Sequence, residues 1–262
     1  MKIAVCMSGQ LRQWEIAKEN QKWFWETSGV EIDYFIHTWD YSGDREGVSQ
    51  PYITRDVSRK EFDKLVDWYK PKGCMFDDRK QDFFYANDHW SSLFYSMAHS
   101  MMLKRQYEID NDFEYDLVIK TRPDVVFDPR YHFSWEPLED NILFATQGGL
   151  MESEFHMFNT NDMVFYGKSY TMDLVIPMYF YRQKMLDQRN LFKDKLFTGS
   201  MGPGVLMQEY FRDYGITTQS IQPNRSTFIE TLVKLGCPQD LNLMDHNEFH
   251  KMEKYFRDWY TK

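Results

Sequence analysis

Continuous apolar runs alternate with amphipathic stretches through the first half of the chain. A strand buried on both faces is apolar at successive positions, whereas a helix that covers a sheet repeats its apolar positions every three or four residues. By these patterns, strands are expected at residues 3–7, 34–37 and 116–120. Helices are expected at 14–27, from the capping box Ser58–Glu61 to a point before Pro71, and at 88–109. Residues 41–56 are polar and contain glycine, so they predict a long loop.

The second half of the chain is patterned less regularly. Strands are expected at 142–145, 163–166 and 216–221, and helices at 169–187, 202–214 and 248–260. The first of these helices is expected to bend or break at Pro177, because proline has no N–H to donate within a helix. We find no internal repeat and no low-complexity segment, so residues 1–262 are interpreted as one domain.

The order β-α-β-α-β-α-β over the first half predicts an α/β fold. Each crossover helix returns the chain to the same end of the sheet, so the strands run parallel and helices cover both faces. The expected fold is a Rossmann-like, three-layer α/β/α sandwich with a mostly parallel central sheet. In such a sheet ligands bind at the carboxyl ends of the strands, near the point where the strand order reverses.

The charge balance narrows the classes of partner. The chain carries 40 Asp and Glu against 31 Lys and Arg, and its formal charge of −9 argues against a nucleic-acid binder, which needs a basic face. An anionic substrate would have to be neutralised locally, by a few Lys or Arg side chains or by a metal ion. Aromatic residues make up 18% of the chain, which suits the stacking of sugar rings, although core packing explains the same enrichment.

The cysteines and the N-terminus bear on the compartment. Cys6, Cys74 and Cys237 are far apart and form no C-x-x-C pair, so neither a zinc ribbon nor a disulfide framework is expected. The N-terminal apolar run is too short for a signal peptide, and no run of about 18 apolar residues is present to span a membrane. We therefore expect a soluble, cytoplasmic protein without a transmembrane segment.

The first two predicted strands end in polar residues that suit a ligand. Ser8-Gly9-Gln10 lets a ligand approach the backbone, and Arg12 can reach a phosphate or a base; a tight turn with a surface arginine is the alternative. After the second strand, His37 and Trp39 offer a hydrogen-bonding ring and a stacking surface. Here the alternative is a structural histidine beside a core tryptophan.

The strongest candidate follows the strand at 116–120. The segment Lys120-Thr121-Arg122-Pro123-Asp124 stands between two apolar runs, so the carboxylate of Asp124 is expected to be buried and to need a partner. A divalent cation that bridges a diphosphate would be such a partner, because hard cations prefer oxygen ligands. An internal Arg122–Asp124 pair is the alternative.

Taken in order, these segments resemble the GT-A glycosyltransferases, in particular small bacterial, phage and giant-virus glycosyltransferase-like proteins. Those proteins open with an apolar strand followed by S-G-Q-x-R and carry a strand that ends in K-T-R-x-D, as Ser8–Arg12 and Lys120–Asp124 do here. A later N-D-x-x-x-x-G segment is matched by Asn161-Asp162 and Gly167. The resemblance covers about residues 1–220. It implies a GT-A-like fold with a nucleotide-binding half at about 1–127 and an acceptor-side half at about 128–262.

The resemblance also implies residue roles. GT-A enzymes hold a metal ion and the donor through a D-x-D triplet, and Arg122-Pro123-Asp124 stands in that place with arginine first. Asp124 is therefore the expected ligand of Mn²⁺ or Mg²⁺. The other candidates follow from position in the sequence: His156, in a polar stretch, is a second candidate ligand, with an exposed loop histidine as the alternative. Asp162, before a strand, and Glu209, on a predicted helix where a solvated side chain is the alternative, are the candidate catalytic bases, with Asp162 favoured. The expected substrate-binding residues are Ser8, Gly9, Gln10, Arg12, His37, Trp39, Lys120 and Arg122.

The function implied is a hexosyltransferase-type glycosyltransferase that moves a sugar from a nucleoside diphosphate sugar, with UDP-sugars favoured, to a carbohydrate or other hydroxyl acceptor. A nucleotide-sugar hydrolase, a nucleotidyltransferase and a non-catalytic nucleotide-sugar-binding protein remain the alternatives. A P-loop or NAD enzyme is not expected, because neither G-x-x-x-x-G-K nor G-x-G-x-x-G follows a strand.

Overall fold

A computed structural model describes most of the first half of the chain and the strands and helices that complete the fold. The described residues are 1–12, 14–26, 30–42, 55–78, 89–127, 139–147, 160–181, 203–220 and 229–231.

The described residues form a central seven-stranded sheet, in the order β10-β8-β9-β6-β1-β2-β5. Its strands are β1 (Lys2–Ser8), β2 (Glu31–Trp39), β5 (Gly73–Asp77), β6 (Leu117–Thr121), β8 (Ile142–Gln147), β9 (Thr160–Gly167) and β10 (Thr217–Ser220). Within this sheet only β9 runs antiparallel to its neighbours, β6 and β8. The predicted mostly parallel α/β sheet is therefore confirmed, and it includes strands from both halves of the chain.

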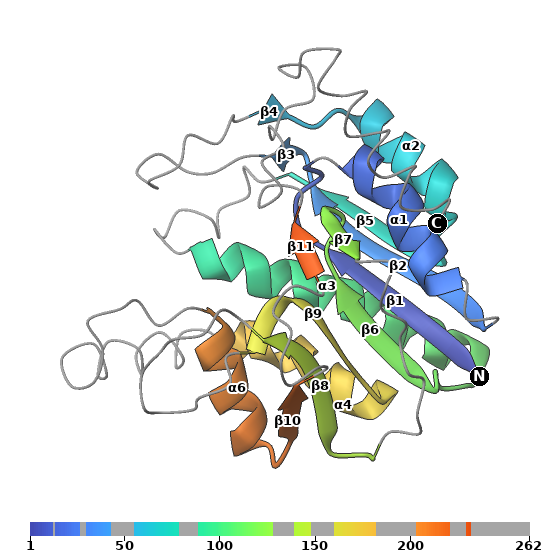
Figure 1. The fold of residues 1–262 in the computed structure, drawn as a ribbon. Helices are drawn as coiled ribbons and strands as arrows, with labels where there is room; N and C mark the ends of the chain where they lie inside the picture. The colour runs from blue at the N-terminus through green and yellow to red at the C-terminus, as the bar shows by residue number, and fades with distance from the viewer. Residues whose placement is uncertain are drawn as a thin grey trace.

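Helices cover both faces of the sheet (Figure 1). They are α1 (Trp14–Glu26), α2 (Arg59–Tyr69), α3 (His89–Asn111), α4 (Ser169–Asp173), a helix at 175–181, and α6 (Pro203–Asp213). Side chains of α1 and α2 pack into one apolar cluster with alternate residues of β1, while α3, α4 and α6 pack into a second cluster with the intervening residues. The structure thus has the three layers expected from the sequence.

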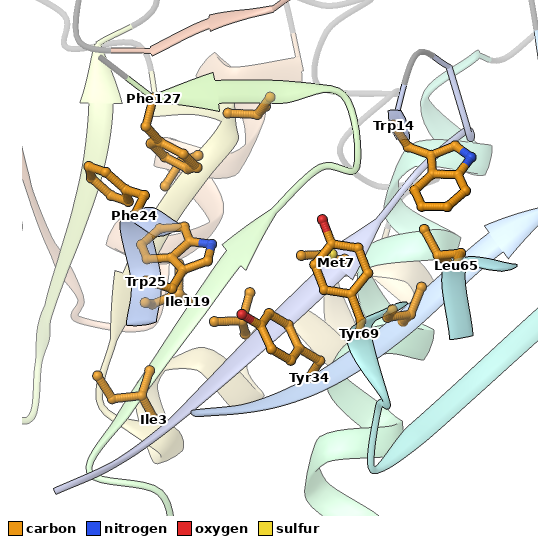
Figure 2. Close-up of a cluster of buried hydrophobic side chains, with 14 of the residues drawn as sticks. Ile3, Met7, Trp14, Phe24, Trp25, Tyr34, Leu65, Tyr69, Ile119 and Phe127 are labelled. Atoms are coloured by element: carbon orange, nitrogen blue, oxygen red, sulfur yellow. The ribbon is translucent and has the colours of Figure 1, made fainter. Parts of the chain in front are cut away.

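The alternation of β1 explains why its sequence is continuously apolar. Ile3, Val5 and Met7 point into the cluster under α1 and α2, whereas Ala4 and Cys6 point into the cluster under α3. Figure 2 shows the first cluster, in which Phe24 and Trp25 of α1 gather around Phe127. The Phe24 and Phe127 rings stack with their centroids 4.2 Å apart. Both faces of β1 are therefore buried in apolar clusters, and its polar residues are confined to its two ends, Lys2 and Ser8.

Local capping signals correctly placed α2. Ser58 is its N-cap, and the Ser58 hydroxyl accepts a hydrogen bond of 3.2 Å from the backbone N–H of Glu61. The helix ends at Lys70, whose φ of 47° and ψ of 53° are left-handed, and Pro71 then prevents its continuation. The expected helix bounds are confirmed here.

Other elements differ from the sequence expectation. The ends of the loop expected at 41–56 pair as a short antiparallel ladder, β3 (Tyr41–Ser42) with β4 (Arg55–Asp56). The helix expected from 169 breaks at Leu174, one turn before Pro177. Pro177 lies in the first turn of the next helix, where a missing N–H costs nothing because the first-turn N–H groups have no intrahelical acceptor. The C-terminal helix expected at 248–260 lies outside the described residues.

A short ladder joins β7 (Val125–Phe127) to β11 (Ile229–Thr231) beside the main sheet. Among the described helices, none is long and apolar enough to cross a membrane.

A buried ionic network joins α3 to α4. The ammonium of Lys104, fully buried, donates to Glu108 Oε2 at 2.9 Å and to Asp173 Oδ1 at 2.6 Å. The Ser169 hydroxyl lies 2.6 Å from both Lys104 Nζ and Glu108 Oε1. Because these charges are removed from water, each depends on its partners.

We expect Lys104→Met to destabilise the fold by about 3–5 kcal/mol, because it removes the buried cation shared by Glu108 and Asp173 and leaves them with the more exposed Arg105, which approaches each at 3.5 Å. Lys64→Met is the matched control, since Lys64 forms only an exposed pair with Glu15, worth about 1 kcal/mol or less. Urea unfolding monitored by tryptophan fluorescence measures both. Equal, small losses in the two variants would contradict the structural importance of the network.

Candidate functional site

The strand order reverses between β1 and β6. From β1 the chain builds the sheet outward through β2 and β5, and α3 then crosses back to place β6 on the other side of β1. The carboxyl ends of these parallel strands lie at one edge, which we call the carboxyl edge. There, Met7 is paired with Thr121 and Ser8 with His37. The segments singled out in the sequence therefore meet at the topological switch point, the usual ligand site of such sheets.

The turn after β1 requires glycine. Gly9 has φ of +126°, a backbone angle that residues with a side chain rarely adopt. Its N–H donates to the carbonyl of His37 at 3.3 Å. A Cβ at this position would lie 4.0 Å from Cγ of Arg122, so the constraint is the backbone angle rather than space. The turn brings the backbone of β1 close to Arg122, and Arg12 Nε then donates to Gln10 Oε1 at 3.1 Å.

Asp124 and Arg122 form a bidentate ion pair. Arg122 Nε lies 2.9 Å from Asp124 Oδ1, and Arg122 Nη2 lies 2.6 Å from Oδ2. Arg12 Nη1 approaches the same Oδ2 at 3.9 Å. The structure therefore contains the internal pair that the sequence left as an alternative, and it adds Arg12 as a second cation.

Burial and charge act in opposite directions on Asp124. Burial alone would raise the pKa of its carboxyl, but the charges of Arg122 and Arg12, with the hydrogen bond from Arg122, hold the pKa below its usual value. Its side chain is 2% exposed, whereas Arg12 and Arg122 are 17% and 19% exposed. One buried carboxylate thus contacts two guanidinium groups, and both guanidinium side chains are partly exposed to solvent.

Helix α1 fixes the strand that follows Asp124. The side-chain amide of Asn20 donates to the carbonyl of Phe127 at 2.8 Å and accepts from the Phe127 N–H at 2.7 Å. Asn20 therefore satisfies both backbone groups of one β7 residue, as a neighbouring strand would. The sequence analysis did not single out Asn20. The available signal was a polar residue in the core-facing stripe of a helix that also includes Trp14, Ala17 and Phe24.

A second polar cluster lies beside β2 and β5. His37 is fully buried; its Nδ1 lies 2.8 Å from Ser96 Oγ, and its Nε2 lies 3.3 Å from Asp77 Oδ2. The Tyr95 hydroxyl donates to the same Asp77 oxygen at 2.8 Å. His37 is thus buried and hydrogen-bonded through both ring nitrogens, and its role in substrate binding stays a prediction.

Aromatic rings enclose the cluster. The Tyr95 ring lies 4.0 Å from the ring of His99 and 5.2 Å from that of Trp39, between centroids. Asp77, Tyr95 and His99 were not singled out from the sequence. Asp77 ends β5, a strand that was not delimited, and the other two lie within the helix expected at 88–109. A carboxylate at the end of the third strand of the sheet was the signal that could have found the cluster.

Three buried hydroxyls at the carboxyl edge are unpaired. Ser8, Thr38 and Thr121 end or nearly end the adjacent strands β1, β2 and β6, and within the described structure their hydroxyl groups have no hydrogen-bond partner. A buried hydroxyl without a partner is uncommon and costs free energy. This edge of the sheet therefore retains hydrogen-bonding capacity that the fold itself does not use.

The remaining candidates lie at different distances from this edge. Lys120 is buried, with its ammonium 5.7 Å from the ring centroid of Phe165. Because β9 is antiparallel and Phe165 is paired with Lys120, the backbone of Asp162 lies toward the carboxyl edge. The backbone of Glu209 lies within α6. His156 and the side chains of Asp162 and Glu209 lie outside the described residues.

The described residues do not by themselves form a metal site. No group of three or more His, Cys, Asp or Glu side chains that could hold a metal ion is found among them. Both oxygens of Asp124 are engaged by Arg122, so a cation would have to compete with a buried guanidinium. The expectation of Mn²⁺ or Mg²⁺ remains a prediction.

Comparison with known proteins finds structural neighbours at low sequence identity. No protein-family model and no curated protein sequence matches the chain. Structural neighbours are glycosyltransferases. The apo form of GlyE from Streptococcus pneumoniae TIGR4 is 14% identical with a TM-score of 0.41, and a second GlyE structure is 14% identical with a TM-score of 0.37. In both alignments 84% of this chain is covered, but it spans only 45% of the GlyE chain.

A third neighbour is a glycosyltransferase involved in glycosylation of the major capsid of PBCV-1. It is 10% identical, with a TM-score of 0.40, and the alignment covers 84% of this chain and 83% of that one. Similarities of this size assign neither a substrate nor a residue role to the chain.

The His37 cluster predicts a pH-dependent stability. Burial lowers the pKa of His37, and the hydrogen bond and charge of Asp77 offset this only in part. The unfolded chain therefore takes up the proton first as the pH falls below about 6.5, and stability present above that pH is lost by up to about 1.4 kcal/mol per pH unit. The pKa of His99 is also lowered, mainly by burial.

Urea unfolding at pH 7.5 and pH 5.5 measures this loss. We expect a smaller loss in His37→Gln than in the native protein, and His99→Gln separates the contribution of the second histidine. If His37→Gln loses as much stability as the native protein over this interval, His37 does not carry the effect.

Proposed function

We propose that the chain is a glycosyltransferase that moves a sugar from a nucleoside diphosphate sugar, with a UDP-sugar favoured, to a carbohydrate or other hydroxyl acceptor. The observation that carries the proposal is the pair of guanidiniums, Arg12 and Arg122, held on one buried carboxylate at the switch point of the sheet. The S-G-Q-x-R and K-T-R-x-D segments, which resemble those of GT-A enzymes, supply these residues.

The arginines suit the charge change of the reaction. The acceptor oxygen bonds to the anomeric carbon of the sugar, the bond from that carbon to the diphosphate oxygen breaks, and the nucleoside diphosphate leaves with the electron pair. Negative charge grows on the leaving oxygen as this bond lengthens. Guanidiniums already fixed by Asp124 stabilise it without reorganising, and their planar forks match phosphate oxygens.

The acceptor proton needs a base if the reaction inverts configuration, and we propose Asp162 for this role, with Glu209 as the alternative. Asp162 is favoured because β9 runs antiparallel, so its beginning, rather than its end, lies toward the carboxyl edge. Glu209 lies on α6, seven residues into an 11-residue helix.

A divalent cation, Mn²⁺ or Mg²⁺, is the proposed cofactor on the resemblance to GT-A enzymes. When bound, such an ion would share the charge of the diphosphate. Among the described residues Asp124 is the oxygen ligand in position to contribute, and it would have to give up part of its bidentate pair with Arg122. The arginines and the cation would thus act on the same charge, and titration of UDP with and without the cation separates their contributions.

We expect UDP to stabilise the protein in a thermal-shift assay; a ligand at a hundred times its Kd contributes about 2.7 kcal/mol. Arg12→Met should raise the Kd for UDP by about tenfold or more, because a hydrogen bond to a charged group is worth about 1.5–3 kcal/mol. Arg59→Met is the control, since Arg59 is an exposed arginine paired with Asp63 on α2.

Repeating the UDP titration with Mn²⁺ and with a chelator tests the cation. An unchanged Kd on chelation would show that the cofactor part of the proposal is wrong. A product assay with UDP-sugars then separates transfer from hydrolysis, because a hydrolase releases free sugar. If the protein binds no nucleotide in a panel of UDP, GDP, ADP and CMP, the proposed function is wrong.

Asp162→Asn should lower turnover by about a hundredfold or more, because a general base usually contributes at least this much to the rate. The affinity for the donor should stay unchanged. Glu209→Gln is the paired variant, and steady-state transfer assays compare the two. Loss of activity in Glu209→Gln alone would transfer the role to Glu209. If neither variant matters, a retaining reaction without a protein base replaces this mechanism.

A further inference from the structure

Gln21 is a buried polar residue of α1. Its side chain contacts the backbone of the segment that contains Arg122, Pro123 and Asp124. Its side-chain nitrogen lies 2.8 Å from the carbonyl oxygen of Arg122, 3.2 Å from that of Pro123 and 2.6 Å from that of Val125. The residue is fully buried. One amide therefore gathers three carbonyl groups from four consecutive residues.

These carbonyls belong to a tight turn. The Val125 N–H donates to the Arg122 carbonyl at 3.4 Å, which makes Pro123 and Asp124 the two central residues of a four-residue turn. Proline suits the first central position because its φ is already fixed near the required value. The turn directs its carbonyls to Gln21, while the side chains at its first and third positions, Arg122 and Asp124, make the bidentate pair.

Tyr69 determines which end of the Gln21 amide faces the turn. The Tyr69 hydroxyl, on the last residue of α2, donates to Gln21 Oε1 at 3.3 Å. With its oxygen occupied by this donor, the amide presents its N–H₂ group to the three acceptors; the reversed amide would point oxygen at oxygen. Figure 2 shows Tyr69 over the sheet beside Tyr34, on the α2 side of the cluster.

We propose that Gln21, oriented by Tyr69, is a positioning residue that sets the geometry of the Arg122–Asp124 pair and so the affinity of the carboxyl edge for a nucleoside diphosphate. The amide touches neither guanidinium, and it acts through the backbone on which both charged side chains are mounted. The ligand part rests on the proposed function, whereas the ordering of the turn does not.

The test uses the full chain with two pairs of variants. Gln21→Met keeps the volume of the side chain but removes the amide, and Met172→Ala, a buried residue of α4 on the opposite face, is a control for general loss of stability. Tyr69→Phe removes one hydroxyl from the relay. Tyr210→Phe is its match, because the Tyr210 hydroxyl donates to the Leu174 carbonyl, among the helices of the opposite face.

Two quantities are measured: hydrogen exchange of the segment 121–127 without ligand, and the Kd for UDP. We expect faster exchange of this segment and a tenfold or larger rise in Kd in Gln21→Met, and smaller changes of the same sign in Tyr69→Phe. The two controls should change neither quantity, even where their melting temperatures fall as far.

Exchange of 121–127 and a Kd for UDP that match those of the controls would overturn the proposal. If Gln21→Met does not fold, Tyr69→Phe decides by the same criteria. If the native protein binds no UDP, the proposed function fails, while the exchange comparison still determines whether Gln21 orders the turn.

Discussion

The ionised carboxylate of Asp124 lies where water is excluded, and the candidate site is built around the need to compensate that charge. Its two oxygens accept both N–H groups of the Arg122 fork, and Arg12 adds a second cation from the neighbouring strand end. A buried carboxylate would otherwise be neutralised or destabilise the fold by several kcal/mol, about 3–5 when a partner is removed. Compensation for one charge therefore brings a second guanidinium into place, in a protein whose net charge is negative.

The sheet topology explains why these groups meet although they are 110 residues apart. Parallel strands begin at one edge and end at the other, so residues that directly follow β1 and β6 are neighbours by construction. The antiparallel strand β9 brings residues of the second half of the chain to the same edge, because the start of an antiparallel strand lies where its neighbours end. Both halves can thus contribute to a single site without any long-range loop.

Much of this could be predicted from the sequence, and the failures have physical causes. Apolar runs and capping residues were sufficient for most strands of the main sheet and for α2, because both faces of β1 are buried and the cap of α2 is local, but not for the partly buried β5. The helix break was expected at Pro177 but occurs at Leu174, because proline is harmless in the first turn of a helix and its effect depends on where the helix begins. The choice between a cation and an arginine as the partner of Asp124 depends on side-chain geometry, which spacing does not contain.

Several of the missed residues share one property: they are polar side chains in positions that a periodic pattern assigns to the core. Asn20 and Gln21 occupy the inward stripe of α1, and Ser96 occupies that of α3. Their partners are backbone groups or residues distant in sequence, so only the assembled fold shows why burial is tolerated. A polar residue inside an apolar stripe is the sequence signal of such a contact, but it does not identify the partner.

The unpaired hydroxyls of Ser8, Thr38 and Thr121 affect which substitutions would make the protein more stable. A sequence selected only for folding would replace them by alanine or valine, because an apolar group of similar shape avoids the cost of a buried, unsatisfied oxygen. Their retention on three adjacent strands means that the edge of the sheet is held below the stability it could reach. Variants that are more heat-resistant should therefore arise easily at these three positions, and the same replacements would show whether binding depends on the hydroxyls.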